Sequence, residues 1–80
     1  NPLIEFAKEL HILNTISNNQ LYIKYKDWCE ETGHNTLARN TFQKRIAKAF
    51  KEYREDLEPY KTKNERGYQK KEDGILPWVE

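Results

Sequence analysis

The 80-residue sequence lacks the features that mark disulfide-bonded, zinc-binding and membrane-spanning domains. Its single Cys cannot form an internal disulfide, and one Cys with two His falls short of the four ligands of a structural zinc site. It has no run of 18 apolar residues and no basic-then-apolar leader, so we expect neither a membrane span nor a signal peptide. These absences favour a cytoplasmic domain without a metal or another cofactor.

Two further absences concern activity and completeness. No nucleophile is paired with a base, and no Gly-rich loop with a following Lys and Ser or Thr is present to hold nucleotide phosphates. We therefore expect this chain to have no catalytic residues and not to be an enzyme itself. Because it contains no Met and begins at Asn1, we expect residues 1–80 to be a single domain cut from a larger protein.

Charge is abundant in the sequence and unevenly distributed. Residues 1–37 hold three Lys against five acids, whereas residues 38–71 hold eleven Lys or Arg against five acids. Residues 72–80 hold three acids and no base. The net charge of +1 therefore conceals one strongly basic segment. Such a segment in a near-neutral chain is a usual footprint of a surface that binds phosphates.

An amphipathic helix is predicted over residues 38–54, at the centre of the basic segment. Its apolar residues recur at helical spacing and form one stripe. The stripe consists of Phe42, Ile46, Ala49, Phe50 and Tyr53. The opposite face combines Lys with an amide and a small residue. Most Lys-rich faces are only solvated, and the alternative is a helix that enters a groove of DNA.

Two earlier helices are predicted from the spacing of their apolar residues. The first covers about 2–12, with Asn1 as its cap and Leu13 at the end of its stripe. The second covers about 19–32, capped by Asn18 or Asn19, and has the strongest amphipathic pattern in the chain. We expect its Tyr25, Trp28 and Cys29 side chains in the core. Residues 15–17 have β-branched character and form at most a very short strand.

The second and third helices are predicted to form a helix-turn-helix. Gly33 ends the second helix as a left-handed cap, and only a short turn separates it from the third. His34 lies in that turn as a solvated residue, with a phosphate contact as the alternative. The turn therefore places two helices in the arrangement that many DNA-binding domains use.

A basic β-hairpin is predicted after the third helix. Pro59 prevents further helix, and residues 64–67 have the composition of a turn. Polar residues on both faces favour an exposed flap over a core sheet, with its five cations close together. After a second turn, the apolar residues of 75–79 are expected to pack back on the first and third helices.

Three helices and a C-terminal hairpin predict a mostly α, α+β fold, the winged helix-turn-helix. In this fold the third helix lies in the major groove, where Asn and Gln contact adenine and Arg or Lys contacts guanine. The hairpin is the wing and contacts a neighbouring groove or the phosphates. The predicted DNA-binding residues are Arg39, Asn40, Thr41, Gln43, Lys44, Ala47, Lys48 and Lys51 in the helix, and Lys61, Lys63, Arg66, Lys70 and Lys71 in the wing. Base reading is expected from residues 39–48, with Lys51 and Arg54 as phosphate contacts at most.

The run LYIKYKDWCEETG at 21–33, followed by TLARNTFQKRI, resembles the C-terminal winged-helix domain of phage, plasmid and poxvirus primase-helicases. The matching positions are Leu21, Tyr22, Tyr25, Trp28, Cys29, Gly33 and Phe42. The resemblance covers roughly residues 3–76. Within this group of proteins, the sequence is similar to replication initiators of mobile genetic islands. It implies an upstream superfamily-3 helicase that acts as a hexamer, with this domain recognising origin repeats in double-stranded DNA. The isolated domain is expected to be a monomer.

Three functions remain open from the residues. The first is sequence-specific binding at a replication origin. The second is sequence-independent binding of duplex or forked DNA, with the wing separating or tracking strands. The third is a protein-interaction module that uses the acidic surface of the first two helices.

Overall fold

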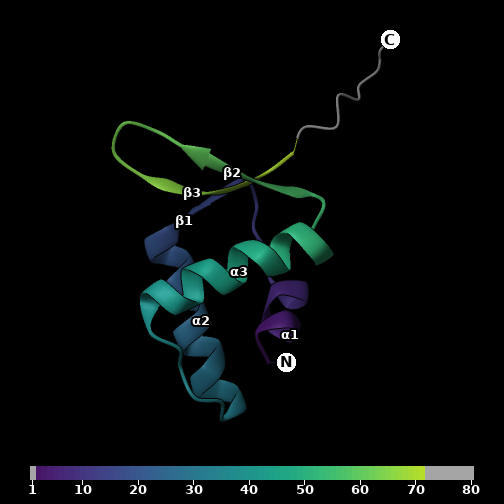
Figure 1. Cartoon of the computed structure of the whole chain (residues 1–80), viewed down its shortest axis with the longest axis vertical. Coiled ribbons are helices and arrows are strands. Elements are labelled where there is room, and N and C mark those ends of the chain that lie inside the picture. The colour runs from purple at the N-terminus through teal and green to yellow at the C-terminus, as the bar shows by residue number, and fades with distance from the viewer. Residues whose placement is uncertain (1, 72–80) are drawn as a thin grey trace.

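The structure, a computed structural model, describes residues 2–71 as three helices and a three-stranded antiparallel sheet. The elements are α1 (Pro2–Glu9), β1 (Thr15–Ser17), α2 (Asn18–Thr32), α3 (Arg39–Tyr53), β2 (Leu57–Lys61) and β3 (Arg66–Lys70). The helices lie on one side of the sheet, and the β2–β3 hairpin extends beyond them (Figure 1). This element order and mostly helical α+β composition agree with the predicted winged-helix fold class.

The prediction of an exposed flap is confirmed for residues 61–66 of the hairpin, but its base belongs to a three-stranded sheet that packs on the core. The strand order is β1-β3-β2, and β3 is therefore the central strand. Gly67 is buried and lies opposite both Ser17 and Tyr60, while Tyr68 packs edge-on against Phe50 with ring centroids 4.8 Å apart. The polar pattern concealed this arrangement because the third strand comes from residues 15–17, far away in the sequence.

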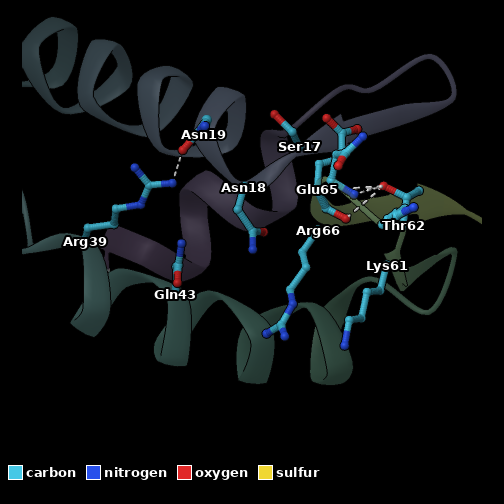
Figure 2. A pocket seen from close by; sticks show the side chains of 11 residues that line it. Ser17, Asn18, Asn19, Arg39, Gln43, Lys61, Thr62, Glu65 and Arg66 are labelled. Carbon is cyan, nitrogen blue, oxygen red and sulfur yellow. Dashed lines mark hydrogen bonds between the residues drawn. The ribbon is translucent and has the colours of Figure 1, made fainter.

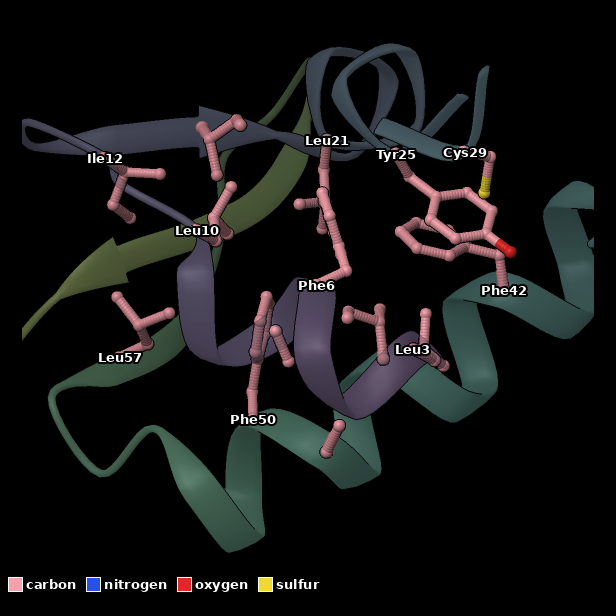
Figure 3. Packing of buried hydrophobic residues seen from close by; sticks show 14 residues of the cluster. Leu3, Phe6, Leu10, Ile12, Leu21, Tyr25, Cys29, Phe42, Phe50 and Leu57 are labelled. Atoms are coloured by element: carbon pink, nitrogen blue, oxygen red, sulfur yellow. The ribbon is translucent and has the colours of Figure 1, made fainter. Parts of the chain in front are cut away.

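The core joins all three helices through aromatic contacts (Figure 3). Tyr25 of α2 stacks on Phe42 of α3 at 4.3 Å between ring centroids, and Phe6 of α1 meets the Tyr25 ring edge-on at 5.5 Å. The apolar stripe of α3 is buried as predicted, except for Tyr53, which is 44% exposed beneath the Lys8 ammonium group. These contacts fix α3 firmly against α1 and α2, leaving its opposite face outward.

α1 ends at Glu9, earlier than the predicted end near residue 12. Leu13, placed on the helical stripe by its spacing, is 91% exposed, whereas Ile12 is buried instead. The reason lies in Arg54, the residue that follows the last residue of α3. Its guanidinium group donates hydrogen bonds to the carbonyl oxygens of Ala7 and Leu10, at 2.9 and 2.7 Å. These carbonyls therefore find partners outside the helix, and α1 stops.

Arg54 is a structural residue, which corrects its interpretation as a phosphate contact. Besides the two carbonyls, it donates two hydrogen bonds of 3.0 Å to the carboxylate of Asp56. The pKa of Asp56 is lowered, mainly by its hydrogen bond from Arg54. Burial is the second-largest influence on this pKa and acts in the opposite direction. The stabilisation from this pair is therefore present at neutral pH and is lost as pH falls through the lowered pKa of Asp56.

We expect Arg54→Met to lower the free energy of unfolding by about 2 kcal/mol, because it leaves two carbonyls of the α1 terminus without their donor. Urea unfolding at neutral pH measures this difference. Arg45→Met is the matched control, since Arg45 is exposed on the same helix and its side chain makes no hydrogen bond or ion pair within residues 2–71. Equal unfolding midpoints for the two variants would contradict the structural role.

The N-cap of α2 differs from the predicted one, whereas its C-cap is the predicted residue. Ser17, not Asn18 or Asn19, is the N-cap: its hydroxyl accepts from the Gln20 N–H, and the Gln20 side chain accepts from the Ser17 N–H. This capping box gives Ser17 two roles, because it is also the last residue of β1. At the other end Gly33 has φ 77°, which confirms the predicted left-handed cap.

Two predictions lie outside the described residues. The first is the cap at Asn1, and the second is the packing of the apolar residues at 75–79.

Trp28, predicted in the core, is half-buried and packs against it, with its ring stacked on His34 at 5.2 Å between centroids. His34 is thus exposed in the turn as predicted, yet one face of its ring is covered.

Candidate nucleic-acid interface

Two tyrosines of α2 hold the turn that leads into α3. The Tyr22 hydroxyl donates to the Leu37 carbonyl oxygen at 2.8 Å, and the Leu37 N–H donates to the Tyr25 hydroxyl oxygen at 3.1 Å. Burial raises the pKa of Tyr25, so its hydroxyl stays protonated at neutral pH. Both polar groups of one turn residue are therefore tied to α2, which fixes the starting point and direction of α3.

The N-terminus of α3 has a positive electrostatic character. Its N-cap, Ala38, provides no side-chain hydrogen bond, and the first turn contains no acid. The unpaired N–H groups and the helix dipole both favour an anion at this end. Arg39 adds a guanidinium group, which donates to the side-chain oxygen of Asn19 and lies over the Tyr22 ring at 6.0 Å. Arg39 thus connects α2 and α3 at the surface.

The outward face of α3 consists of two parallel rows of residues four apart. The row nearer the hairpin is Arg39, Gln43, Ala47 and Lys51, and the next row is Asn40, Lys44 and Lys48. All are exposed except Gln43, which is half-buried, as is Thr41 on the far flank. The only ion pair among residues 2–71 is Arg54–Asp56. The lysines of both rows therefore keep their full charge toward solvent.

The hairpin tip and the N-terminal ends of α2 and α3 enclose a groove of about 470 Å³ (Figure 2). We call it the cationic groove. It brings together five predicted site residues from two distant segments: Arg39, Gln43, Lys61, Lys63 and Arg66. The side chains of Lys61, Lys63 and Arg66 make no hydrogen bond or ion pair within the described chain. Together with the two α3 rows, this groove forms one surface, the helix–wing surface.

The cationic groove also contains residues that the sequence interpretation missed. Ser17, Asn18 and Asn19 line it from the start of α2, and Asn64 lines it from the hairpin tip. From the sequence, Ser17 was interpreted as part of a very short strand, and Asn18 or Asn19 as the cap of the second helix. That these residues face the hairpin follows from the pairing of β1 with β3, a contact across about fifty residues of chain.

The five wing cations do not lie together, which corrects the prediction that they form one cluster. Lys70 and Lys71 are at the base of the hairpin, at the opposite end from the tip. Lys71 lines a second hollow of about 490 Å³ with Ala47 and Lys51 of α3. Lys48 lines a hollow on the α1 side, beside Arg45 and Glu52. The tip cations and the base cations therefore meet different ends of α3.

Residues 2–71 contain no group of three or more His, Cys, Asp or Glu placed to hold a metal ion. None of the helices that the structure describes is long and apolar enough to cross a membrane. Cys29 is buried, and its thiol points to the Asn35 carbonyl oxygen at 3.9 Å.

Residues 1–79 match a family model described as poxvirus D5 protein-like. No curated protein and no solved structure matches the chain.

Proposed function

This chain belongs to the poxvirus D5 protein-like family, which is associated with primase-helicases, and from that premise we propose that it is a winged helix that binds double-stranded DNA. We further propose that it recognises repeats at a replication origin and thereby recruits an attached hexameric helicase. The observation that carries the proposal is the helix–wing surface, where cations from α3 and from the hairpin tip face the same groove and none of them forms an ion pair with Glu65, the acid that lines it.

The dimensions and chemistry of α3 suit a DNA groove. A helix of 15 residues is about 22 Å long, and its outward face offers amides at positions 40 and 43 beside Lys44. Asn and Gln pair with adenine through two hydrogen bonds, and Lys contacts guanine or a phosphate. Ala47 is small enough to let the helix approach a base edge. The hairpin tip then reaches the adjacent phosphate strand with Lys61, Lys63 and Arg66.

Sequence-independent binding is the alternative that the same surface supports. Most of its cations are lysines, which bind phosphates as point charges without reading bases. The two functions differ in what the amides do. If Asn40 and Gln43 contact bases, their removal affects one DNA sequence; if they do not, only the cations determine affinity.

We expect Lys44→Ala to weaken binding to every duplex by about tenfold, and Asn40→Ala to weaken binding to origin DNA alone by about 1–3 kcal/mol. Fluorescence anisotropy with an origin duplex and a scrambled duplex, at matched salt concentration, measures both. Lys24→Ala is the control, because Lys24 is exposed on α2 beside Asp27 and away from the helix–wing surface.

Each outcome decides a different part of the proposal. Equal affinity of the unaltered domain for both duplexes would exclude sequence-specific recognition. Equal losses for Lys44→Ala and Lys24→Ala would exclude α3 as the contacting helix. Tighter binding of the origin duplex than of the scrambled one, with this difference in affinity lost in Asn40→Ala, is the result we expect.

A further inference from the structure

The hairpin tip is closed by one hydroxyl group. The Thr62 side-chain oxygen accepts from the N–H groups of Asn64 and Glu65, at 3.3 and 3.0 Å, and donates to the Glu65 carbonyl oxygen at 3.2 Å. The Thr62 N–H donates to the same carbonyl at 2.8 Å. A hydroxyl has one donor and two acceptor positions, so the Thr62 oxygen is fully used within four residues of chain.

Glu65 completes this network and leaves the neighbouring cations unpaired. Its carboxylate accepts a hydrogen bond from the Tyr60 hydroxyl, across the two strands. That bond raises the pKa of Tyr60, which therefore remains a donor at neutral pH. Although Glu65 lies between Lys63 and Arg66 in the sequence, it makes no ion pair with either. The one acid of the tip thus holds the loop in shape and does not bind its cations.

Besides these bonds, the tip is attached through the pairing of β2 with β3, which reaches Lys61 and Arg66. Residues 61–66 are all exposed, so the loop gains no rigidity from the core. An exposed loop without internal bonds samples many conformations and must be ordered when it binds a partner, which weakens binding. Loops whose tips carry the ligand-binding groups benefit most when that ordering already exists in the free protein.

We propose that Thr62 is a positioning residue of the helix–wing surface, whose hydroxyl, together with Glu65, holds the tip in its DNA-binding shape before DNA arrives. Lys61, Lys63 and Arg66 then meet the phosphate strand without an ordering step. This inference rests on the proposed DNA-binding function and adds a residue that touches no phosphate itself. A hydroxyl that only stabilised the hairpin would change the thermal stability and not the affinity of the folded protein.

Three variants at the tip separate these roles. Thr62→Val removes the hydroxyl and keeps the shape, Thr62→Ser keeps the hydroxyl, and Lys63→Ala removes one charge. The measurements are affinity for duplex DNA at several salt concentrations, well below each melting temperature, and amide hydrogen exchange at Asn64 and Glu65. We expect Thr62→Val to weaken binding about five- to tenfold with an unchanged salt slope, and to speed exchange at both amides.

The other two variants have different expected signatures. Thr62→Ser should bind within about twofold of the unaltered protein because its hydroxyl is retained. Lys63→Ala should lose affinity and reduce the salt slope by about one, as expected for a phosphate contact.

Four results would overturn the inference: unchanged affinity in Thr62→Val, a loss in Thr62→Ser of the same size, a reduced salt slope in Thr62→Val, or a loss that follows the unfolded fraction. Failure of the unaltered protein to bind any duplex would instead overturn the DNA-binding proposal. The two failures are therefore distinguishable in one experiment.

Discussion

The affinity of the domain for duplex DNA should fall by about 10³-fold when the salt concentration rises from about 50 to about 200 mM. Of the seven cations of the helix–wing surface, six are expected to contact phosphates, namely Arg39, Lys44, Lys51, Lys61, Lys63 and Arg66. The seventh, Lys48, lines the hollow on the α1 side. Each phosphate contact releases counterions and contributes about 0.9 to the slope of log affinity against log salt. Six contacts thus give a slope near −5, which anisotropy titrations at four or five salt concentrations measure directly.

A double variant tests whether helix and wing act on the same DNA. Lys44→Ala with Arg66→Ala removes one cation from α3 and one from the hairpin tip, so we expect the slope to become shallower by about two. Lys24→Ala is the control. It removes one positive charge from α2, away from the helix–wing surface, and should leave the slope unchanged. A slope near −1 for the unaltered protein would contradict a binding mode in which both elements contact phosphates.

The local parts of the fold follow from the sequence. The buried stripe of α3 and the left-handed cap at Gly33 depend on residues within a few positions of one another, and both were predicted, apart from the exposed Tyr53. The end of α1 was missed because it depends on Arg54, whose guanidinium comes from 44 residues further along the chain. Periodicity alone extended the helix to Leu13, since no local residue signals the stop.

The candidate site divides in the same way. Its chemistry, a basic helix face with amides and a basic hairpin, is visible in the sequence. Its geometry is not, because the pairing of β1 with β3 decides which residues face the hairpin. That pairing adds Asn18 and Asn19 to the cationic groove, whereas the register of β2 with β3 places Lys70 at the base of the hairpin, away from the tip cations. Alternation within the hairpin holds no information about a third strand that starts at Thr15.

Gly67→Ala should lower the free energy of unfolding by about 4 kcal/mol, a large share of the total stability of a domain of this size. A Cβ atom at Gly67 would lie 2.0 Å from the carbonyl oxygen of Ile16 and 2.7 Å from the Cα atom of Ser17. Both are backbone atoms, which cannot rotate away as a side chain does. The clash is therefore relieved only if β1 separates from the central strand β3.

β1 has little freedom to move because two of its three residues are held by contacts outside the sheet. Ile16 is buried in the core, and Ser17 caps α2 through the reciprocal hydrogen bonds with Gln20. Displacing the strand thus exposes a core side chain and uncaps a helix at once. Gly67 also lies opposite Tyr60, so the same clash would disturb the hairpin that carries the tip cations.

Gly33→Ala is the matched control for this effect, because it tests the same substitution where the constraint is conformational instead of steric. A Cβ atom at Gly33 would meet nothing within 4 Å, but the residue has φ +77°. We expect a loss of about 1 kcal/mol there, the usual penalty of the left-handed conformation for a residue with a Cβ atom. Urea unfolding of both variants measures the difference. Equal losses at the two glycines would mean that β1 does not pack on Gly67 as closely as the structure places it, and would remove the basis for assigning α2 residues to the cationic groove.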